Sequence, residues 1–366
     1  MKKAHRHRPQ KMMRRSSRVY LNDLNAGKAD RLTEFLHRCH DALQYFVDVF
    51  WQRQDFSADL ADLETVHRGR DGFGLTTRLA QALAKQAKEM VRSAHAQGKR
   101  QPQVRKHAVT LYCHFVKVER FDGSFDWAVK LVGSGAPRMV IPAKSTAHLN
   151  AKLADGWTVA KTIRLGRDHR KRLFVDFILE KPRPSLKTEG TIEGMDSNYK
   201  QGLVLSDGQT VGQAVYERIQ TFSQRQKNTK AEIKSLVGHA LKQLDLSGVK
   251  TLCIEHLKHV RQGTRGKFPR TLNRRLSHWL YAYIADWLAR RCEELGIRLL
   301  RKSPDYTSMT CSVCDRCDRR SRVGDRFQCR HCGFSCDADL NAALNLKRLG
   351  EAGVYGLRSL PSWSFV

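Results

Sequence analysis

The sequence predicts a multidomain protein of the α+β class, with a helical segment and a β-rich segment ahead of a half in which strands and helices alternate. Three observations support this prediction. The 366 residues exceed what one hydrophobic core comfortably organises, so two or three domains are expected. Short β-rich runs separated by Gly, Pro and Asp turns fill residues 106–183. Strand and helix patterns then alternate from about residue 187 onward.

The first hundred residues are expected to be mainly helical. Residues 16–24 are predicted to form one strand, and apolar residues at helical spacing predict a long amphipathic helix after it. A second helix is expected from Thr76 or Thr77, with Leu79, Leu83 and Ala87 facing inward. Its outward face is almost purely basic, which favours contact with phosphate, although a solvated face is the alternative. The four outward cations are Arg78, Lys85, Lys88 and Arg92.

Residues 106–183 fit an antiparallel barrel or a sandwich. A linker at residues 182–185 then precedes a new domain that begins close to residue 187, where two apolar strands meet at a turn of Ser206, Asp207 and Gly208. Further strands are expected at residues 249–257 and 297–300, with a flexible, basic loop at 260–270 between them. A long helix follows the loop, and its inward positions are Leu272, Leu276, Leu280, Ile284 and Trp287.

The charge of the chain predicts a polyanionic partner. There are 66 Lys and Arg residues against 36 Asp and Glu residues, which gives a formal net charge of +30. Such a surplus repels itself unless a polyanion neutralises it, so nucleic acid is the expected partner. No apolar stretch reaches the roughly 18 residues of a membrane span, and the basic first 15 residues lack the apolar core of a signal peptide. We therefore expect no membrane partner and a cytoplasmic protein associated with nucleic acid.

Six of the ten cysteines crowd into residues 311–336, and their spacing predicts a zinc site. Cys311 and Cys314 form one CxxC pair, and Cys329 and Cys332 form a second pair 14 residues later. Two such pairs can place four thiolates tetrahedrally around one structural Zn²⁺. Cys317 and Cys336 offer overlapping spacings, but the favoured register leaves both as free thiols.

Three acidic residues lie where carboxylates are costly. Asp196 falls inside an otherwise apolar strand, Glu255 ends the buried run of residues 251–254, and Asp339 stands at the entry to a helix. Buried carboxylates need a partner or a metal, and three of them can hold the two Mg²⁺ ions, or Mn²⁺ ions, that hydrolyse a phosphodiester. Asp337 is the alternative third acid, but as the residue that opens the helix it is better suited to capping.

Five features in this order resemble the TnpB/OrfB transposon-associated proteins and the related miniature type V CRISPR effectors. They are the strand with Asp196, the strand with Glu255, DYTSMTCSVC at residues 305–314, CRHCG at 329–333 and DADLNAALNL at 337–346. The resemblance covers residues 190–350, whereas the N-terminal half is similar in element order alone. It implies an RNase H-like (RuvC) α/β domain with an inserted zinc ribbon, preceded by a β-barrel wedge domain and a helical recognition lobe.

The resemblance also implies domain boundaries. These are residues 1–24 for the first wedge strand and a basic arm, 25–105 for the recognition lobe, 106–186 for the wedge domain, 187–304 for the RuvC domain, 305–336 for the zinc ribbon, and 337–366 for the last RuvC helix and the tail. One departure is visible, because Asn198 stands where a glycine often follows the first acid by two positions.

The function that the resemblance implies is RNA-guided cleavage of DNA. Asp196, Glu255 and Asp339 would be the catalytic acids, and the partners would be a guide RNA and target double-stranded DNA with a short flanking motif. The cations of the basic helix would contact the guide–target duplex, and a mobile loop beside the cleft would contribute Arg261, Arg265, Lys267 and Arg270. The alternative is a nuclease-inactive RNA-guided or zinc-ribbon DNA-binding protein. A transposase or a junction resolvase fits less well, since no helix-turn-helix domain is evident and about 180 residues precede the nuclease half.

Overall fold

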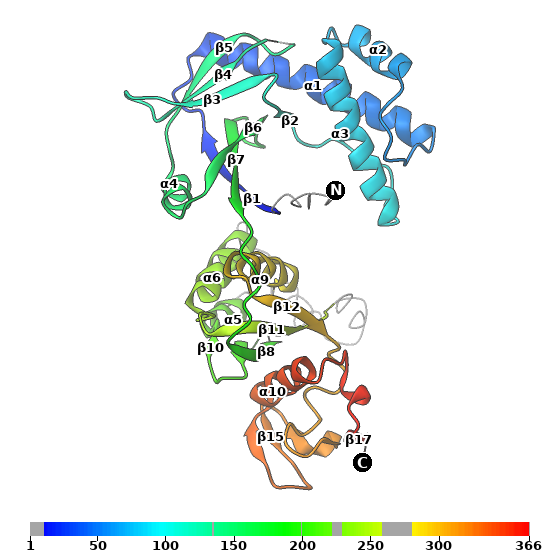
Figure 1. Ribbon diagram of the computed structural model, residues 1–366, viewed down its shortest axis with the longest axis vertical. Helices are drawn as coiled ribbons and strands as arrows, with labels where there is room; N and C mark the ends of the chain where they lie inside the picture. The colour runs from blue at the N-terminus through cyan, green and yellow to red at the C-terminus, as the bar shows by residue number, and fades with distance from the viewer. Residues whose placement is uncertain (1–10, 134, 199, 222–228, 258–279, 366) are drawn as a thin grey trace, which may run out of the picture. The chain divides into compact units, whose positions relative to one another are not determined.

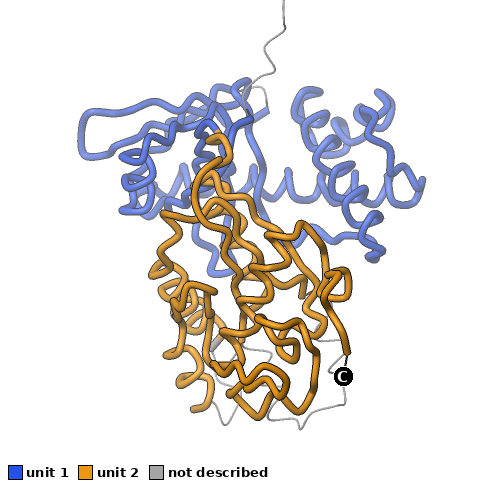
Figure 2. The backbone as a smooth tube through the Cα atoms, turned by 60° about the horizontal axis from the view of Figure 1, so that its bottom comes forward, with its two compact units in different colours: residues 1–182 blue, residues 183–366 orange. Residues whose placement is uncertain are grey.

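The computed structural model describes residues 11–133, 135–198, 200–221, 229–257 and 280–365. The chain divides into two compact units, residues 1–182 and residues 183–366, which are shown in different colours in Figure 2. They are called unit 1 and unit 2 below. Between the described ranges lie residues 258–279, so the predicted basic loop and the first turns of the helix after it fall outside the described residues.

Three helices lie in the first hundred residues of unit 1, namely α1 (Ala26–Gln52), α2 (Leu63–Gly72) and α3 (Thr77–Ala96). Each helix is preceded by an N-cap residue whose side chain accepts a hydrogen bond from a backbone N–H of the first turn. These N-cap residues are Asn25, Asp62 and Thr76. The apolar stripe of α1 is fully buried and packs against α3, as the helical spacing predicted. These helices and the sheets described next share one hydrophobic core.

One predicted outward cation of α3 is in fact buried. Arg78, Lys85 and Arg92 are exposed, whereas Lys88 is 6% exposed. Its Nζ lies 2.8 Å from Asp55 Oδ2 and 3.0 Å from Ser57 Oγ, both in the segment that follows α1. Position 88 lies one turn before the buried Val91, so helical geometry places it on the edge of the apolar stripe, where Asp55 neutralises its charge. The prediction that Lys88 faces outward was therefore wrong.

The strands of unit 1 form two antiparallel sheets. The first has the order β1-β7-β6-β2, from β1 (Met12–Tyr20), β7 (Leu173–Pro182), β6 (Thr158–Arg167) and β2 (Ala108–Leu111). The second is β3 (Val116–Arg120), β4 (Trp127–Leu131) and β5 (Met139–Ala143), and α4 (Ala147–Ala154) follows it. Within the described residues no strand pairing joins the two sheets, so hydrogen bonds do not close the predicted barrel there.

Unit 2 is built on a mixed five-stranded sheet of order β10-β9-β8-β11-β12. Its strands are β8 (Thr191–Asn198), β9 (Gly202–Leu205), β10 (Thr210–Val211), β11 (Val249–Glu255) and β12 (Arg298–Lys302). The first three form an antiparallel meander, and β11 runs parallel to both β8 and β12. Because parallel strands end at the same edge of a sheet, the carboxyl ends of β8 and β11, which carry Asp196 and Glu255, lie side by side.

Helices cover both faces of this sheet, so its central strands are apolar on both sides (Figure 1). On one face α5 (Gln213–Gln220), α6 (Thr229–Gln243) and α9 (Tyr281–Leu295) enclose a core that includes Leu252 and Ile254. On the other face α10 (Ala338–Glu351) packs on Cys253 through Leu346 and Leu349. The alternation of Leu252, Cys253 and Ile254 between the faces follows the two-residue period of a strand.

The cysteine-rich segment that was predicted to form a zinc ribbon, called the ribbon below, lies between β12 and α10. It contains β13 (Arg316–Cys317), the 3₁₀ turn η1 (Arg319–Ser321), and a small sheet of β14 (Arg322–Val323), β15 (Arg326–Gln328) and β16 (Ser335–Asp337). After α10 come the turn η2 (Leu357–Ser359) and β17 (Ser364–Phe365), which pairs with β13. A search of the described residues finds no helix of the length and apolarity needed to cross a membrane.

Helix α10 approaches β8 so closely that one position admits no side chain. A Cβ atom on Gly194 would clash with the carbonyl oxygen of Ala343 and lie 2.5 Å from the backbone nitrogen of Lys347. Both obstacles are backbone atoms, which cannot rotate away. The glycine therefore sets the distance between the strand of Asp196 and the helix of Asp339.

Replacing Gly194 with alanine should destabilise the protein by about 1–3 kcal/mol, because helix and strand must separate to admit the methyl group. Urea unfolding measures the loss. Gly248→Ala is the matched control, since a Cβ there meets nothing within 4 Å, and its change should stay within about 0.5 kcal/mol. Equal stabilities of the two variants would contradict the packing argument.

Candidate active site and metal centre

The three predicted acids line one pocket of about 280 Å³ in unit 2. Asp196 comes from the end of β8, Glu255 from the end of β11 and Asp339 from the first turn of α10. Other residues that line the pocket are Ser197, Asn198, Tyr281, Pro304, Thr307, Ser308, Arg322 and Ala342. The parallel strands and the packing of α10 thus bring together residues far apart in the chain, such as Asn198 and Asp339, which are 141 positions apart.

Burial and mutual repulsion disfavour ionisation of these acids. Asp196 is 8% exposed, and its pKa is raised well above the ordinary value by burial, by the charge of Glu255 and by that of Asp339. Burial raises the pKa of Glu255 to about 7, with a further contribution from Asp339. The pKa of Asp339 is also raised by burial, which a hydrogen bond from Asn198 and the nearby Arg322 partly oppose. Such a group of acids is stabilised when cations enter it.

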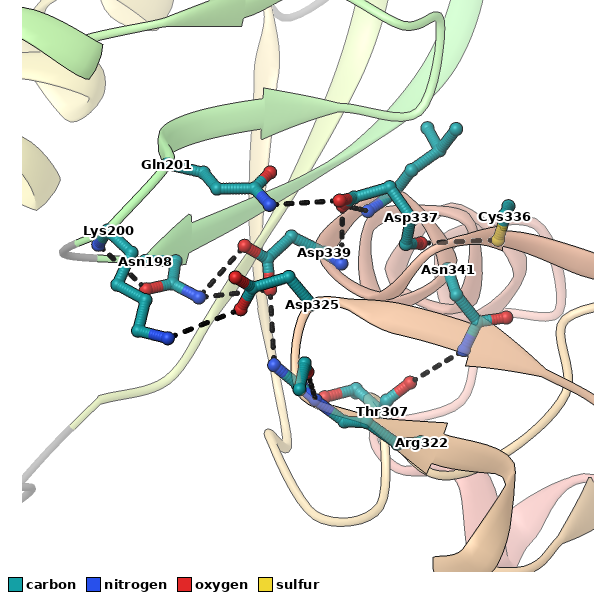
Figure 3. A network of polar contacts seen from close by, with 12 residues as sticks. Asn198, Lys200, Gln201, Thr307, Arg322, Asp325, Cys336, Asp337, Asp339 and Asn341 are labelled. Carbon is teal, nitrogen blue, oxygen red and sulfur yellow. Dashed lines mark hydrogen bonds and ion pairs between the residues drawn. The ribbon is translucent and has the colours of Figure 1, made fainter.

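The two candidate third acids have different surroundings (Figure 3). Asp339 is 2% exposed, and its carboxylate accepts from Nδ2 of Asn198 at 3.0 and 2.8 Å, with Nη2 of Arg322 at 3.5 Å. Asp337 is the N-cap of α10 and accepts from the backbone nitrogens of Asp339 at 2.8 Å and Leu340 at 3.1 Å. Asp337 is not among the residues that line the pocket. Helix geometry thus separates a capping acid from an acid that faces the pocket.

The segment that carries Thr307 supports the opposite wall of the pocket. Thr307 Oγ1 lies 3.3 Å from Glu255 Oε1. The backbone of this segment is held by two fully buried amides of α10, because Nδ2 of Asn345 donates to the carbonyls of Thr307 and Thr310 at 2.8 Å, and Nδ2 of Asn341 donates to that of Thr310 at 2.8 Å. Helix α10 therefore carries Asp339 itself, and its Asn345 side chain holds the backbone of Thr307, the residue that contacts Glu255.

The spacing of the acids differs from that of a single-ion cluster. In the part of the chain that the structure describes, the one group of at least three His, Cys, Asp or Glu residues with ligand atoms all within 4.8 Å of one another is Cys311, Cys314, Cys329 and Cys332. The carboxylates of the pocket are spread more widely. The acids of the pocket are therefore not grouped as compactly as the four cysteines.

The four cysteines of the favoured register form a cluster compatible with one structural metal ion. The sulfurs of Cys311 and Cys332 are 3.6 Å apart, as are those of Cys314 and Cys329. A tetrahedral Zn²⁺ with bonds of about 2.3 Å separates its sulfurs by about 3.8 Å, so the donor set fits zinc. Backbone N–H groups of Val313 and His331 point at the sulfurs of Cys311 and Cys329, both at 3.4 Å, and can stabilise thiolates.

The remaining predicted residues lie elsewhere. Cys317 is buried outside the cluster, and the thiol of Cys336 donates to the carbonyl of Asp337 at 3.2 Å. The exposed cations of α3 belong to unit 1, and the four cations of the basic loop, Arg261, Arg265, Lys267 and Arg270, lie outside the described residues.

Sequence reasoning assigned no role in the pocket to Arg322, Thr307 or Tyr281, because nothing in the pattern distinguishes them from other ribbon and helix residues. The amide of Asn198 was equally unexpected there, although its position was noted as a departure from the glycine of relatives.

Comparison with known proteins finds one local family match and a similar overall fold. Residues 281–346 match the family model described as Cas12f1-like, TNB domain. A solved Cas12f1 chain, from a cryo-EM structure of a Cas12f1–sgRNA–target DNA complex, aligns with 88% of this chain and 83% of its own length, with a TM-score of 0.55 and 13% identity. The chain therefore shares the multidomain, mixed α/β fold of that effector.

Two curated relatives match over shorter segments. The CRISPR-associated endodeoxyribonuclease Cas12f1 of Sulfoacidibacillus thermotolerans is 39% identical over 75 residues, which are 20% of this chain and 18% of the relative. A TnpB-like protein of Aquifex aeolicus is 35% identical over 89 residues, 23% of this chain and 29% of the relative. The matched segments thus span less than a third of either relative. The resemblance to TnpB proteins and miniature type V CRISPR effectors is confirmed by these matches.

Zinc binding should depend on Cys311 and not on Cys317. Cys311→Ser should lose the metal, because a serine hydroxyl is a poor zinc ligand, whereas Cys317→Ser should keep about one zinc per chain. Metal content by mass spectrometry of the purified variants decides between them. Loss of zinc from Cys317→Ser alone would show that the cysteines bind in the other register.

The buried acids should weaken the magnesium-free fold at high pH. In the folded protein the pKa of Glu255 is raised from 4.5 to about 7. Its contribution to stability is therefore fully present below about pH 4.5 and is lost as the pH rises through about 7. The raised pKa of Asp196 acts in the same direction. Zinc-loaded Asp196→Asn should therefore be more stable than the wild type at pH 8, because it has one fewer buried carboxylate to ionise.

Urea unfolding without magnesium, at pH 5 and pH 8, measures the difference between the two proteins. It should shrink toward pH 5, and Mg²⁺ should reduce it at pH 8 by stabilising the wild type. Equal urea midpoints of the two proteins at pH 8 would contradict the argument that ionised acids in the pocket destabilise the fold.

Proposed function

We propose that this protein is an RNA-guided DNA endonuclease that hydrolyses phosphodiester bonds in the pocket of Asp196, Glu255 and Asp339. The observation that carries the proposal is the meeting of three carboxylates, from two parallel strands and a helix, in one pocket, where Asp196 and Asp339 are buried and Glu255 is partly buried. Carboxylates are retained in such positions for metal-dependent chemistry. The names of the relatives, an endodeoxyribonuclease and a protein solved with a guide RNA and target DNA, support the same activity.

The architecture of unit 2 supports assignment as a RuvC-type domain with an inserted zinc ribbon. An antiparallel meander followed by two parallel strands, with helices on both faces, is the arrangement of RNase H-like folds. In this proposal the wedge and recognition domains correspond to the sheets and helices of unit 1.

Asp196, Glu255 and Asp339 would hold two Mg²⁺ ions, or Mn²⁺ ions, which when bound supply a Lewis acid and an activated water. The chain's own residues prepare the site for them. The three acids interact electrostatically with one another, so their charges would act together on the ions that they would hold. Thr307 supports Glu255, and Arg322 contributes a guanidinium to the pocket lining, where a phosphate would find a positive charge.

Nucleic-acid binding is proposed for the basic face of unit 1. Arg78, Lys85 and Arg92 are exposed along one stripe of α3 and would contact phosphates of the guide–target duplex, while guide pairing would select the sequence. The net charge of +30 is in keeping with a large polyanion. A nuclease-inactive DNA-binding protein would have the same charge, but would have no use for three destabilising acids in one pocket.

A matched pair of variants tests the proposal. Asp339→Ala should lower the rate of DNA cutting by several orders of magnitude, because it removes a carboxylate from the pocket. Asp337→Ala, two residues away, should cost about 1 kcal/mol of stability through the lost cap and change cutting little. Cleavage is measured on plasmids that match the RNA purified with the protein, with zinc content and affinity for DNA determined in parallel.

Both variants should retain zinc and guided binding to DNA. Cutting by Asp339→Ala at the wild-type rate would refute the assignment of the site, and cutting that does not depend on the copurified RNA would refute guidance.

A further inference from the structure

Asn198, the last residue of β8, contacts the third acid of the pocket. Its Nδ2 donates to both carboxylate oxygens of Asp339, at 3.0 and 2.8 Å, across 141 positions of sequence (Figure 3). The guanidinium of Arg322 reaches the same carboxylate at 3.5 Å. The amide therefore makes the shorter contacts, and it is a neutral donor to a charged acceptor in a buried site.

The orientation of this amide is fixed by its own turn. Oδ1 of Asn198 accepts from the backbone N–H of Lys200 at 2.9 Å. The reverse orientation would place Oδ1 against two carboxylate oxygens and would lose the bond to Lys200. The side chain is therefore held at both ends, so the donor remains directed at Asp339.

Two other side chains of the turn between β8 and β9 also contact the rest of unit 2. Nε2 of Gln201 donates to Asp337 Oδ2 at 2.9 Å, and Nζ of Lys200 lies 3.4 Å from Asp325 Oδ1 of the ribbon. These contacts tie the turn between β8 and β9 to the ribbon and to the start of α10. Removing the amide of Asn198 would leave them in place, so its effect on Asp339 can be separated from attachment of the turn.

We propose that Asn198 is a positioning residue that orients the Asp339 carboxylate and thereby sets the affinity of the divalent ion that Asp339 would hold. This inference rests on the proposed function for the identity of the site. A carboxylate held through hydrogen bonds keeps a lone pair directed at the pocket, whereas a free carboxylate must lose rotational freedom when the ion binds. A ligand's hydrogen-bonding partner of this kind typically contributes 10-fold to 100-fold in metal affinity or activity.

The test compares Asn198→Ala with Gln201→Ala, which alters the same turn but contacts the capping acid. Mn²⁺ binding to the zinc-loaded protein, without nucleic acid, is measured by electron paramagnetic resonance. Asn198→Ala should weaken at least one Mn²⁺ site about 10-fold or more, and Gln201→Ala should change binding less than about 3-fold. In cleavage assays Asn198→Ala should raise the half-saturating Mg²⁺ concentration more than it lowers the rate at saturating Mg²⁺.

Unfolding midpoints and zinc content are measured for both variants, since loss of either would indicate damage to the fold. A merely structural role would lower the cleavage rate at every Mg²⁺ concentration and leave the half-saturating value unchanged, which would overturn the inference. So would equal weakening of Mn²⁺ binding in the two variants, or wild-type Mn²⁺ binding in Asn198→Ala. A wild type that binds Mn²⁺ and does not cut DNA would refute the proposed function alone, because the Mn²⁺ comparison still decides the role of Asn198.

Discussion

The contact between helix α10 and strand β8 is the constraint on which the candidate site depends. At Gly194 the two backbones approach so closely that no Cβ fits between them. Because α10 packs here, Asp339 lies at the end of β8, and Asn341 and Asn345 reach the segment of Thr307. The same packing places Arg322 of the ribbon beside the pocket. A bulkier residue at the contact would therefore alter all three at once.

The three acids of the pocket lower the stability of the fold when no ion is bound. Burial raises the pKa values of all three acids, neighbouring carboxylates raise them further, and the surrounding donors offset only part of this effect. Structures accept such local strain where function requires it, and the rest of the fold must supply the difference. In unit 2 the compensation comes from the apolar cores on the two faces of the sheet and from the cysteine cluster, whose metal would add binding energy to folding.

The features of this protein that could be predicted from the sequence are those that depend on short-range spacing. The four cysteines lie together, as the spacing of the two CxxC pairs predicts. Asp337 caps α10 and Asp339 faces the pocket, because residues two apart on a helix point in different directions. Lys88 could not be placed, because its burial depends on Asp55, which lies 33 positions earlier and in another element. The amide of Asn198 and the guanidinium of Arg322 reach Asp339 through tertiary packing alone, for which the local pattern carries no signal.

Strand β16 ends at Asp337, and α10 begins at the next residue, so the small sheet of the ribbon and the helix of the third acid are joined without a spacer. With no intervening loop to absorb displacement, a shift of the ribbon is passed on to Asp339 almost undiminished. The position of the Asp339 carboxylate in the pocket therefore depends on how firmly the cysteine cluster, several residues upstream, holds the ribbon. Under the proposed function, a site that would hold oxygen-bound ions thus owes its geometry to a framework that a thiolate-bound ion would hold together.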